Sequence, residues 1–389
     1  MLCHQGKPLE NHLGRSAFLK KTYFYPLANF LPQISSELMS KSNKNSLVGV
    51  IGSGSFGTAV SNLLAVNTDV LIYSRKKNIV DHINTEHSHP NFEVRLSDRI
   101  RATNDLQEVA ERCTLIFPIV TSEGFRPMMQ SLSPFLRPYH ILIHGTKGFD
   151  INNMTEEELR QGKITRKGVR TMSEVIHEES VVLRIGCLSG PNLASEIMAG
   201  QPTATVIGSK FDEVVSLGKK VLSSKHFQVF GTYEILGAEL AGALKNIIAI
   251  GSGILGGLGL GKNIQALLIN RGLMEMIYFG KALGTSPKPF VGTAGIGDLI
   301  CTATSMSSRN YTFGYRFGQG EKTKDILASM PEIAEGVRTL KIAKHLADHL
   351  KLHVPITQML YRAVHEDYDI SLAIEYLMRY PYYVDVDFI

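Results

Sequence analysis

The residues best suited to chemistry lie on an apolar stretch in the second half of the chain. In Glu239-Leu-Ala-Gly-Ala-Leu-Lys245-Asn246, a lysine and an asparagine stand on a segment with helical spacing that is otherwise apolar. Burial of an ammonium group lowers its pKa toward the range useful for acid–base work. Alternatively, the lysine lies at the edge of the helix and extends its head to water. The pattern makes Lys245 a candidate general acid or base.

Two further segments carry polar groups that could hold a substrate. Gly295-Ile-Gly-Asp298-Leu predicts a tight loop that presents one carboxylate, although Asp298 could equally cap a helix. Ser308-Arg309-Asn310 offers a hydroxyl, a fork-shaped cation and an amide, a set suited to a phosphate group. The same trio could also be a helix start. Together these residue types indicate a phosphorylated small molecule.

A glycine-rich segment matches the dinucleotide-binding fingerprint Gly-x-Gly-x-x-Gly. In Gly52-Ser-Gly54-Ser-Phe-Gly57, the first glycine permits a tight turn, the second lets the backbone approach a pyrophosphate, and the third lets helix and strand pack closely. The pyrophosphate would lie on the N-terminus of the following helix, where free N–H groups and the helix dipole favour negative charge. Such glycines also arise by chance in loops. Here the motif follows a β-branched run and opens a helix, which is the context that identifies a nucleotide site.

The end of the second expected strand bears on the choice between NAD and NADP. An acidic residue there binds the ribose 2′-hydroxyl, whereas a basic residue accommodates a 2′-phosphate. This chain has Ser74-Arg75-Lys76-Lys77 and no carboxylate. The segment could be a solvated basic turn, because charge runs are often plain surface. We favour NADP, with Arg75 and Lys76 beside its 2′-phosphate.

The elements that must position these residues fall into two sets. Strands alternating with helices imply right-handed crossovers and a doubly wound sheet, so we expect an α/β, Rossmann-like domain over residues 46–232. Beyond about residue 232 the strand-like runs disappear and helical spacing dominates, so we expect an all-helical domain over 233–389. The expected strands are 46–52, 70–73, 115–120, 140–144, 181–188 and 204–207, and the expected helices are 55–66, 235–250, 264–283, 334–350 and 356–366.

Three segments fit neither set. Residues 150–171 are polar and charged with little to bury, and are interpreted as a surface insertion. Residues 251–261 contain Gly-x-Gly, but no strand precedes them, so close helix packing or a tight turn is expected. Residues 1–45 have few acids and lack the unbroken apolar run of a secretory signal. They could be an organellar transit peptide, a disordered extension, or residues upstream of a true start at Met39. We expect a disordered extension and a cytoplasmic location.

Composition excludes several classes of protein. With 389 residues, 44% of them hydrophobic and 20% charged, the chain is typical of a soluble globular protein with two domains. The net charge of +5 suits anionic ligands, and no Lys/Arg block indicates nucleic-acid binding. No run reaches the roughly 20 apolar residues of a membrane span.

Metal and thiol chemistry are not expected. The cysteines (Cys3, Cys113, Cys187 and Cys301) are far apart, which argues against a zinc site or a disulfide framework and fits a reducing compartment. Cys301 lies near the candidate site, but a small packed side chain is the favoured interpretation. His87 and His89 could form a metal pair, yet two solvated loop histidines are commoner.

The order of the motifs resembles one family. Gly-Ser-Gly-Ser-Phe-Gly-Thr-Ala, Thr146-Lys147-Gly148, Leu188-Ser-Gly-Pro-Asn, Gly-Ala-Leu-Lys245-Asn246, Gly-Ile-Gly-Asp298-Leu, Ser308-Arg-Asn and Glu335-Gly-Val-Arg338 follow one another as in NAD(P)-dependent glycerol-3-phosphate dehydrogenase of the bacterial type. The resemblance covers roughly residues 46–380. It implies reversible hydride transfer between NAD(P)H and dihydroxyacetone phosphate, giving sn-glycerol 3-phosphate for phospholipid synthesis. It also implies a homodimer.

The resemblance assigns roles to individual residues. Lys245 would protonate the developing C2 alkoxide, and Lys147 would contact both substrate and cofactor. Cations around an oxygen that gains charge stabilise the transition state. The remaining substrate positions would be Asn246, Asp298, Thr302, Ser308, Arg309, Asn310, Gly190 and Asn192, and the remaining cofactor positions Ser55, Phe56, Ala194, Ile333, Glu335 and, shared with the substrate, Arg309.

This chain departs from the family pattern in several places. Phe56 stands where Trp is common, Thr121 replaces a usual proline, and Asn192 replaces a usual serine. The last change puts that substrate contact in doubt. Two rivals stay open: a β-hydroxyacid dehydrogenase, in which the cluster at 308–310 would bind a carboxylate, and a non-catalytic protein that senses NADPH.

Overall fold

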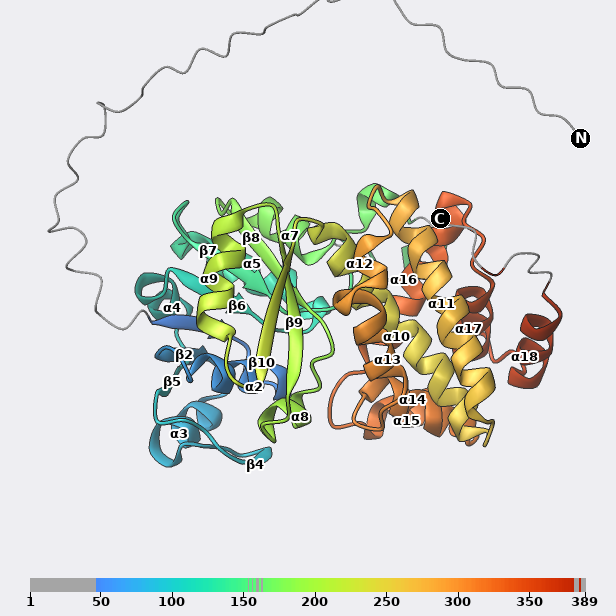
Figure 1. Ribbon diagram of the computed structural model, residues 1–389, viewed down its shortest axis with the longest axis horizontal. Coiled ribbons are helices and arrows are strands. Elements are labelled where there is room, and N and C mark those ends of the chain that lie inside the picture. Colours follow the sequence, from blue (N-terminus) through green and yellow to red (C-terminus); the bar gives the residue numbers. More distant parts are fainter. Residues whose placement is uncertain are drawn as a thin grey trace, which may run out of the picture. The chain divides into compact units, whose positions relative to one another are not determined.

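The computed structural model describes residues 47–152, 154–155, 157–158, 161, 164–380 and 385. The expectations for residues 1–45 lie outside the described residues. An eight-stranded sheet is followed in the chain by a group of helices (Figure 1). The strands of the sheet are β1 (Val48–Ile51), β2 (Val70–Tyr73), β5 (Ile100–Thr103), β6 (Leu115–Pro118), β7 (Ile141–His144), β8 (Arg184–Ser189), β9 (Thr203–Ser209) and β10 (Phe227–Thr232).

The order of the strands locates the switch point of the sheet, which is where ligand crevices lie in folds of this class. The sheet runs β10-β9-β8-β7-β6-β1-β2-β5, and β1 pairs in parallel with both β2 and β6. Because the chain moves outward from β1 first in one direction and then in the other, the order reverses between β1 and β6. In open α/β sheets, ligands bind at the carboxyl ends of the strands at such a switch point. The glycine-rich segment begins directly after β1.

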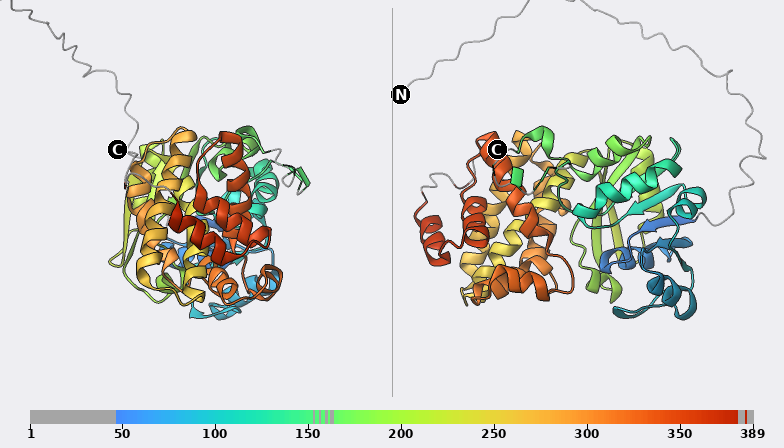
Figure 2. Two further views of the ribbon diagram at one scale, coloured as in Figure 1. Left: turned by 90° about the vertical axis from the view of Figure 1, so that its right-hand side faces the viewer. Right: turned by 180° about the vertical axis from the view of Figure 1, so that it is seen from behind.

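Helices cover both faces of the sheet, as a doubly wound fold requires (Figure 2). On one face Val60, Ile79 and Val214 of three helices pack on the strands, and on the other Val109 and Phe125 do so. The expected Rossmann-like class is therefore confirmed. The helices and 3₁₀ turns of this half are α2 (Ser55–Leu64), α3 (Lys77–Glu86), α4 (Leu106–Arg112), α5 (Ser122–Leu132), η1 (Ser133–Phe135), η2 (Arg166–Gly168), α7 (Met172–Glu179), α8 (Ala194–Met198) and α9 (Asp212–Leu222).

The sheet differs from the expectation in two respects. Strands β5 and β10 and the hairpin of β3 (Ser88–His89) and β4 (Phe92–Arg95) were not expected, because each is short or carries exposed polar positions. In addition, β9 runs antiparallel to β8. The chain leaves the carboxyl end of β8 through α8, which packs on α2 at that same edge, so the next strand starts from there and runs back.

The second half is helical and is built around α10 (Ile235–Gly257), which contacts α11, α13, α14 and α16. We propose the domain boundary near residue 232, since β10 ends at Thr232 and α10 begins at Ile235. The other elements are α11 (Lys262–Ala282), α12 (Lys288–Val291), the π-helical turn η3 (Thr293–Gly297), α13 (Asp298–Ala303), α14 (Arg309–Gly318), α15 (Thr323–Ser329), α16 (Glu335–Leu350), α17 (Pro355–His365) and α18 (Ile370–Arg379).

Glycines in α10 allow it to pack against α14 almost backbone to backbone. A Cβ at Gly253 would lie 2.1 Å from the Tyr311 carbonyl oxygen, and one at Gly257 would lie 2.1 Å from that of Tyr315. On the other side, a Cβ at Gly314 would lie 2.0 Å from the Ile250 carbonyl oxygen. Close helix packing, one of the two expected explanations of the glycine-rich stretch, is therefore confirmed for its first part.

Length and composition alone would let α10 cross a membrane, since an 18-residue window reaches a mean hydropathy of 1.4. No such run was expected from the sequence. However, 89% of that window is buried inside the protein, as in the central helix of a packed core.

Most described residues of 150–171 are at least partly exposed, as expected for a surface segment, but a few of them are buried. Ile164 is 1% exposed and Val169 is 3% exposed, and both belong to the helical core. Asp150 forms a β-bridge with Arg170, and its carboxylate accepts a 2.9 Å hydrogen bond from Arg126. A mostly polar segment can be fixed to a core by a few buried apolar residues, so its composition alone did not predict these contacts.

Candidate active site

One buried carboxylate lies between two lysines. The Lys147 Nζ atom is 2.5 Å from Oδ2 of Asp298, and the Lys245 Nζ atom donates to Oδ1 of the same residue. The Asp298 side chain is only 1% exposed. Isolated buried charges are costly, and Asp298 offsets part of the cost of burying the two lysine head groups.

A π-helical turn, which is a rare backbone feature, positions Asp298. The π-helical turn η3 leads directly into α13, whose first residue is Asp298. A Cβ at Gly295 would lie 2.1 Å from the Phe290 carbonyl oxygen, so glycine is required at this turn. Four residues after Asp298, the Thr302 hydroxyl accepts a 2.5 Å hydrogen bond from Lys245. Single π-turns occur frequently at functional sites.

Lys147 comes from the loop after β7. Its Nζ atom donates to the Gly190 carbonyl oxygen at 3.3 Å as well as to Asp298. Gly190 follows β8 and has a φ of +153°, and a Cβ there would lie 3.0 Å from the Thr205 Cα. The ends of two neighbouring strands and a helix of the other half therefore meet at one carboxylate.

Lys245 is 5% exposed on α10, so the interpretation of a lysine that extends its head to water does not hold. Burial lowers the pKa of this ammonium group, Asp298 opposes the shift, and the nearby Lys147 adds to it, with a resulting pKa of about 7. A group with this pKa can both give and take a proton near neutral pH.

A second buried network on the same helix was missed from the sequence. Glu239 accepts hydrogen bonds from the Ser173 backbone N–H (2.8 Å) and hydroxyl (2.6 Å), and its Oε1 atom is 2.9 Å from Nε2 of His144. Burial would raise the pKa of Glu239, but the His144 imidazole and Ser173 outweigh burial and hold it below its usual range. The network ties α10 to the end of β7, three residues before Lys147. The signal for this network in the sequence was Glu239 itself, a second charged residue in the same apolar helix as Lys245.

The glycine-rich loop has the geometry that its sequence predicts. Gly52 has a φ of +118°, and a Cβ there would lie 2.0 Å from the Ile119 carbonyl oxygen after β6. A Cβ at Gly57 would lie 2.0 Å from the Gly52 carbonyl oxygen, whereas one at Gly54 would face open space. The open face at Gly54, directly before the N-terminus of α2, therefore fits a pyrophosphate group.

Two glutamates before or at the start of α16 reach helix N-termini at this crevice. Glu332 accepts from the Ser55 hydroxyl (2.6 Å) and contacts the Ser55 backbone N–H (3.4 Å) at the start of α2. Its other oxygen accepts from Arg309 at 2.6 Å. Glu335 accepts from the Ser122 backbone N–H at 2.9 Å, at the start of α5. Glu332 was not identified from the sequence, which carries no local signal for it.

The basic segment after β2 is exposed at Arg75 and Lys76, with Ser74 buried beneath it. The Ser74 hydroxyl accepts from the Ser53 hydroxyl at 2.7 Å and from the Lys76 backbone N–H at 3.3 Å. The strand end is therefore fixed to the glycine-rich loop while both cations stay free to meet a ligand.

Ser308-Arg309-Asn310 is a helix start, the second of the two interpretations. Ser308 is the N-cap of α14 and accepts from the Tyr311 backbone N–H. Asn310 Oδ1 accepts from the Gly336 backbone N–H at 2.8 Å. Arg309, with its side chain 45% exposed, contacts Glu332 rather than the Asp298 cluster. A helix N-terminus can still receive a phosphate.

The remaining expected residues lie around these two centres. Asn246 is buried beside Lys245. Asn192 bonds to Thr205 (2.8 Å) and to the Ala204 carbonyl oxygen (3.0 Å), so its amide supports the wall behind Gly190. Ile333 directly follows Glu332 and is 56% exposed, Ala194 packs against the core of the sheet half, and Phe56 lies against Gly145, two residues before Lys147.

The remaining residues singled out from the sequence are His89, Cys301 and Thr121. His89 was expected to be solvated, which was wrong: it is 3% exposed, and its Nε2 atom lies 2.9 Å from the Ser53 carbonyl oxygen, because the unexpected β3–β4 hairpin folds it under the glycine-rich loop. Cys301 is half-buried, and burial raises the pKa of its thiol. Thr121, at the place of a usual proline, caps α5 by accepting from Gly124.

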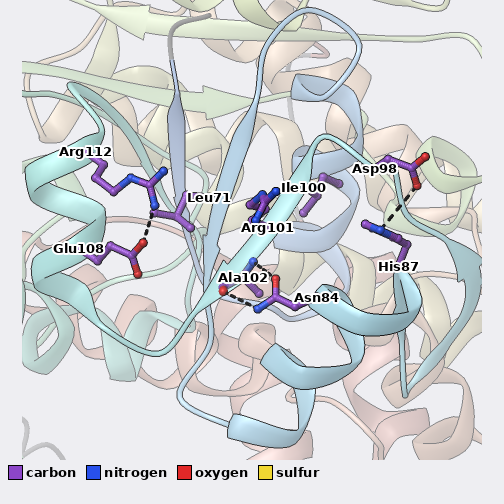
Figure 3. A pocket seen from close by; sticks show the side chains of 9 residues that line it. All are labelled: Leu71, Asn84, His87, Asp98, Ile100, Arg101, Ala102, Glu108 and Arg112. Atoms are coloured by element: carbon purple, nitrogen blue, oxygen red, sulfur yellow. Dashed lines mark hydrogen bonds and ion pairs between the residues drawn. The ribbon is translucent and has the colours of Figure 1, made fainter.

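A cavity of about 450 Å³ lies elsewhere, at the β5 edge of the sheet (Figure 3). Four of its charged lining groups form two pairs: Arg112 with Glu108 at 2.6 Å, and His87 with Asp98 at 3.8 Å. The Asn84 amide donates to the Ala102 carbonyl oxygen and accepts from the Ala102 N–H, so both backbone groups of this residue on the edge strand β5 have partners. This cavity is remote from the lysine cluster. Within the described ranges, no group of three His, Cys, Asp or Glu residues could hold a metal ion.

Together, the switch-point crevice and the paired lysines define a dinucleotide-dependent oxidoreductase. The model of the NAD-dependent glycerol-3-phosphate dehydrogenase N-terminus matches residues 47–215, and that of its C-terminus matches residues 234–375. The chain belongs to this family, as its motifs indicated.

Individual relatives agree with this assignment. A glycerol-3-phosphate dehydrogenase [NAD(P)+] of Exiguobacterium sp. is 38% identical over 340 residues, covering 86% of this chain and 95% of the relative. One of Staphylococcus epidermidis is 36% identical over 85% of this chain and 97% of its own. The crystal structure of glycerol-3-phosphate dehydrogenase from Coxiella burnetii superposes with a TM-score of 0.78 at 29% identity, covering 86% of this chain and 99% of that one.

Proposed function

We propose that the protein catalyses the reversible NAD(P)H-dependent reduction of dihydroxyacetone phosphate to sn-glycerol 3-phosphate. The observation that supports this most is the buried Asp298, held between Lys147 and Lys245 where the sheet meets the helical half. This arrangement offers a proton donor and a second cation to an oxygen that gains negative charge. A bound nicotinamide supplies the hydride.

In this proposal Lys245 is the general acid of reduction and the general base of oxidation. Its proton would go to the oxygen at C2 of the substrate as that oxygen becomes an alkoxide. Asp298 and the Thr302 hydroxyl fix the ammonium through two hydrogen bonds, so the donor is oriented before the substrate arrives. Asn246 lies next to it and would bind a substrate hydroxyl.

Lys147 stabilises the same oxygen from the side of the sheet. Its side chain is 18% exposed, compared with 6% for Lys245, so it is the more open of the two cations. It reaches the substrate from the loop after β7, beside the wall of Gly190 and Asn192.

The phosphate group would be held at the start of α14. Arg309 supplies a charged fork, and it is the first residue of α14, where the helix dipole favours negative charge. An anchored phosphate fixes the carbonyl carbon relative to the nicotinamide, which is the role of a remote binding group in catalysis.

The cofactor would lie across the crevice after β1 and β6, with its pyrophosphate at Gly54 and Ser55. Phe56, Ala194, Ile333 and Glu335 would surround its nicotinamide half. Arg75 and Lys76 favour NADP because two exposed cations and no carboxylate stand at the end of β2. We further propose a cytoplasmic homodimer that makes glycerol 3-phosphate for phospholipid synthesis and needs no metal.

The experiment measures oxidation of NADPH and of NADH by the purified protein with dihydroxyacetone phosphate. Lys245→Ala should lower turnover by about 10²–10⁴-fold, the usual contribution of a general acid. Lys220→Ala, a change at an exposed lysine of α9, is the matched control. Absence of turnover together with tight NADPH binding would contradict the proposed reaction and direct attention to hydroxyacid substrates, or to a sensor if those fail too.

A further inference from the structure

Glu332 lies where an anionic ligand would be expected. It belongs to the connection between α15 and α16 and crosses to the N-terminus of α2 on the sheet side of the crevice. Its two carboxylate oxygens are 2.6 and 2.8 Å from the Ser55 hydroxyl, and one is 3.4 Å from the Ser55 backbone N–H. Helix N-termini after a glycine-rich turn are binding sites for the pyrophosphate of a dinucleotide.

The same carboxylate also neutralises Arg309. The Arg309 Nη1 atom donates to Glu332 at 2.6 Å. The proposed function assigns this exposed cation to the substrate phosphate, and the family resemblance makes it a position shared with the cofactor. One side chain therefore occupies two groups that a phosphorylated ligand needs. A carboxylate and a pyrophosphate compete for them, because both are negative and accept hydrogen bonds from the same donors.

We propose that Glu332 sets the affinity for the dinucleotide by holding the Ser55 N–H and Arg309 in the free enzyme and leaving when the pyrophosphate binds. The contact is weak enough to be exchanged, since the Glu332 side chain is 32% exposed and that of Arg309 is 45% exposed. Dinucleotide binding then includes the cost of releasing Glu332, which lowers the observed affinity in proportion to the occupied fraction. This inference rests on the proposed dinucleotide site.

The test is Glu332→Gln, which keeps the size of the side chain and its ability to bond the Ser55 hydroxyl but removes the charge. Binding of NADPH and of inorganic pyrophosphate is measured by calorimetry, without substrate. Both should bind about two- to fivefold more tightly to Glu332→Gln, which is the scale of one exposed ion pair. The gain should shrink at high salt, because exposed charges are screened.

The control is Glu321→Gln, in which the lost carboxylate pairs with Arg316 of the same helix α14, outside the crevice. It should leave both affinities unchanged.

A thermal melt separates a structural role of Glu332 from competition with the ligand. Glu332→Gln should melt at a lower temperature than the parent without ligand, yet its melting temperature should rise more on addition of NADPH.

Each outcome decides the question. Unchanged or weaker binding of NADPH to Glu332→Gln, with normal binding to the parent, would overturn this inference and leave the proposed reaction intact. Failure of the parent itself to bind either NADPH or pyrophosphate would overturn the dinucleotide site and this inference together. Tighter binding of both ligands, restricted to Glu332→Gln, would support it.

Discussion

At the crevice after β1 and β6, Glu332 and Glu335 reach from the helical half to the N-termini of α2 and α5, and their side chains remain partly in contact with water. At Asp298 a carboxylate from the helical half also reaches the sheet half, but it lies between two lysines and is almost completely buried. Exposed ion pairs contribute little and exchange easily, whereas breaking a buried pair costs several kcal/mol. Burial therefore distinguishes contacts that a ligand could replace, at Glu332 and Glu335, from contacts that must stay, at Asp298.

The strongest test of this comparison removes the buried charge. Asp298→Asn leaves two lysines without their shared anion, so we expect turnover to fall by about 10²–10³-fold and the protein to lose about 3–5 kcal/mol of unfolding free energy. Initial rates and denaturant unfolding measure the two effects. Asp348→Asn, which breaks the more exposed pair with Lys344, should change neither by much. Equal effects of the two variants would contradict the comparison.

The pH dependence of the rate follows from the buried lysine. Because the pKa of Lys245 is about 7, its acid form dominates below that pH. The rate of ketone reduction should therefore fall as pH rises through about 7, while the rate of alcohol oxidation should rise over the same range. Values of kcat/KM against pH in both directions measure this. Asp298 holds the pKa of Lys245 up, so Asp298→Asn should move any remaining midpoint to lower pH, and an unmoved midpoint would rule out Lys245 as the titrating group.

An intermediate effect is expected at the exposed cations of the crevice. The double variant Arg75→Ala/Lys76→Ala should weaken NADPH binding by about tenfold, because each lost contact with a phosphate is worth a modest amount in water. NADH binding should be unaffected. Lys77→Ala, at the next exposed residue, is the control. A similar loss for both dinucleotides would show that the basic segment does not contact a 2′-phosphate.

The smallest effects compare one substitution at two places. Ser173→Ala removes a hydroxyl that donates to the buried Glu239, and Ser122→Ala removes one that donates to the half-buried Glu335. We expect unfolding free energies lower by about 2 kcal/mol in the first variant and about 1 kcal/mol in the second, because unsatisfied buried charge is more costly. Reversible denaturant unfolding measures both, and the reverse order would contradict the argument from burial.

What could be predicted from the sequence depends on how local each feature is. The glycine-rich loop is defined by Gly52, Gly54 and Gly57 within one turn of chain, and its geometry followed from those residues alone. Lys245 was visible as a charge in an apolar helix. These features need no knowledge of distant contacts.

Other features depend on contacts between distant segments. Asp298 was visible as a loop carboxylate, but its position between Lys147 and Lys245 depends on three separate elements. Glu332 lies in the short connection between α15 and α16, and only the fold brings it to Ser55. His89 was misjudged for the same reason, since its burial depends on a hairpin with little apolar pattern.

The π-helical turn η3 makes the position of Asp298 depend on the number of residues in the turn as well as on their side chains. Such a turn contains one residue more than an α-helical turn, so it behaves as a single-residue insertion held in the backbone. Since each residue of an α-helix rotates the chain by about 100°, loss of one residue such as Ile296 would rotate Asp298 relative to the segment before it and away from both lysines. A one-codon deletion there would abolish the cluster without altering any charged residue. Lineages that keep this chemistry should therefore show no length variation across 293–298.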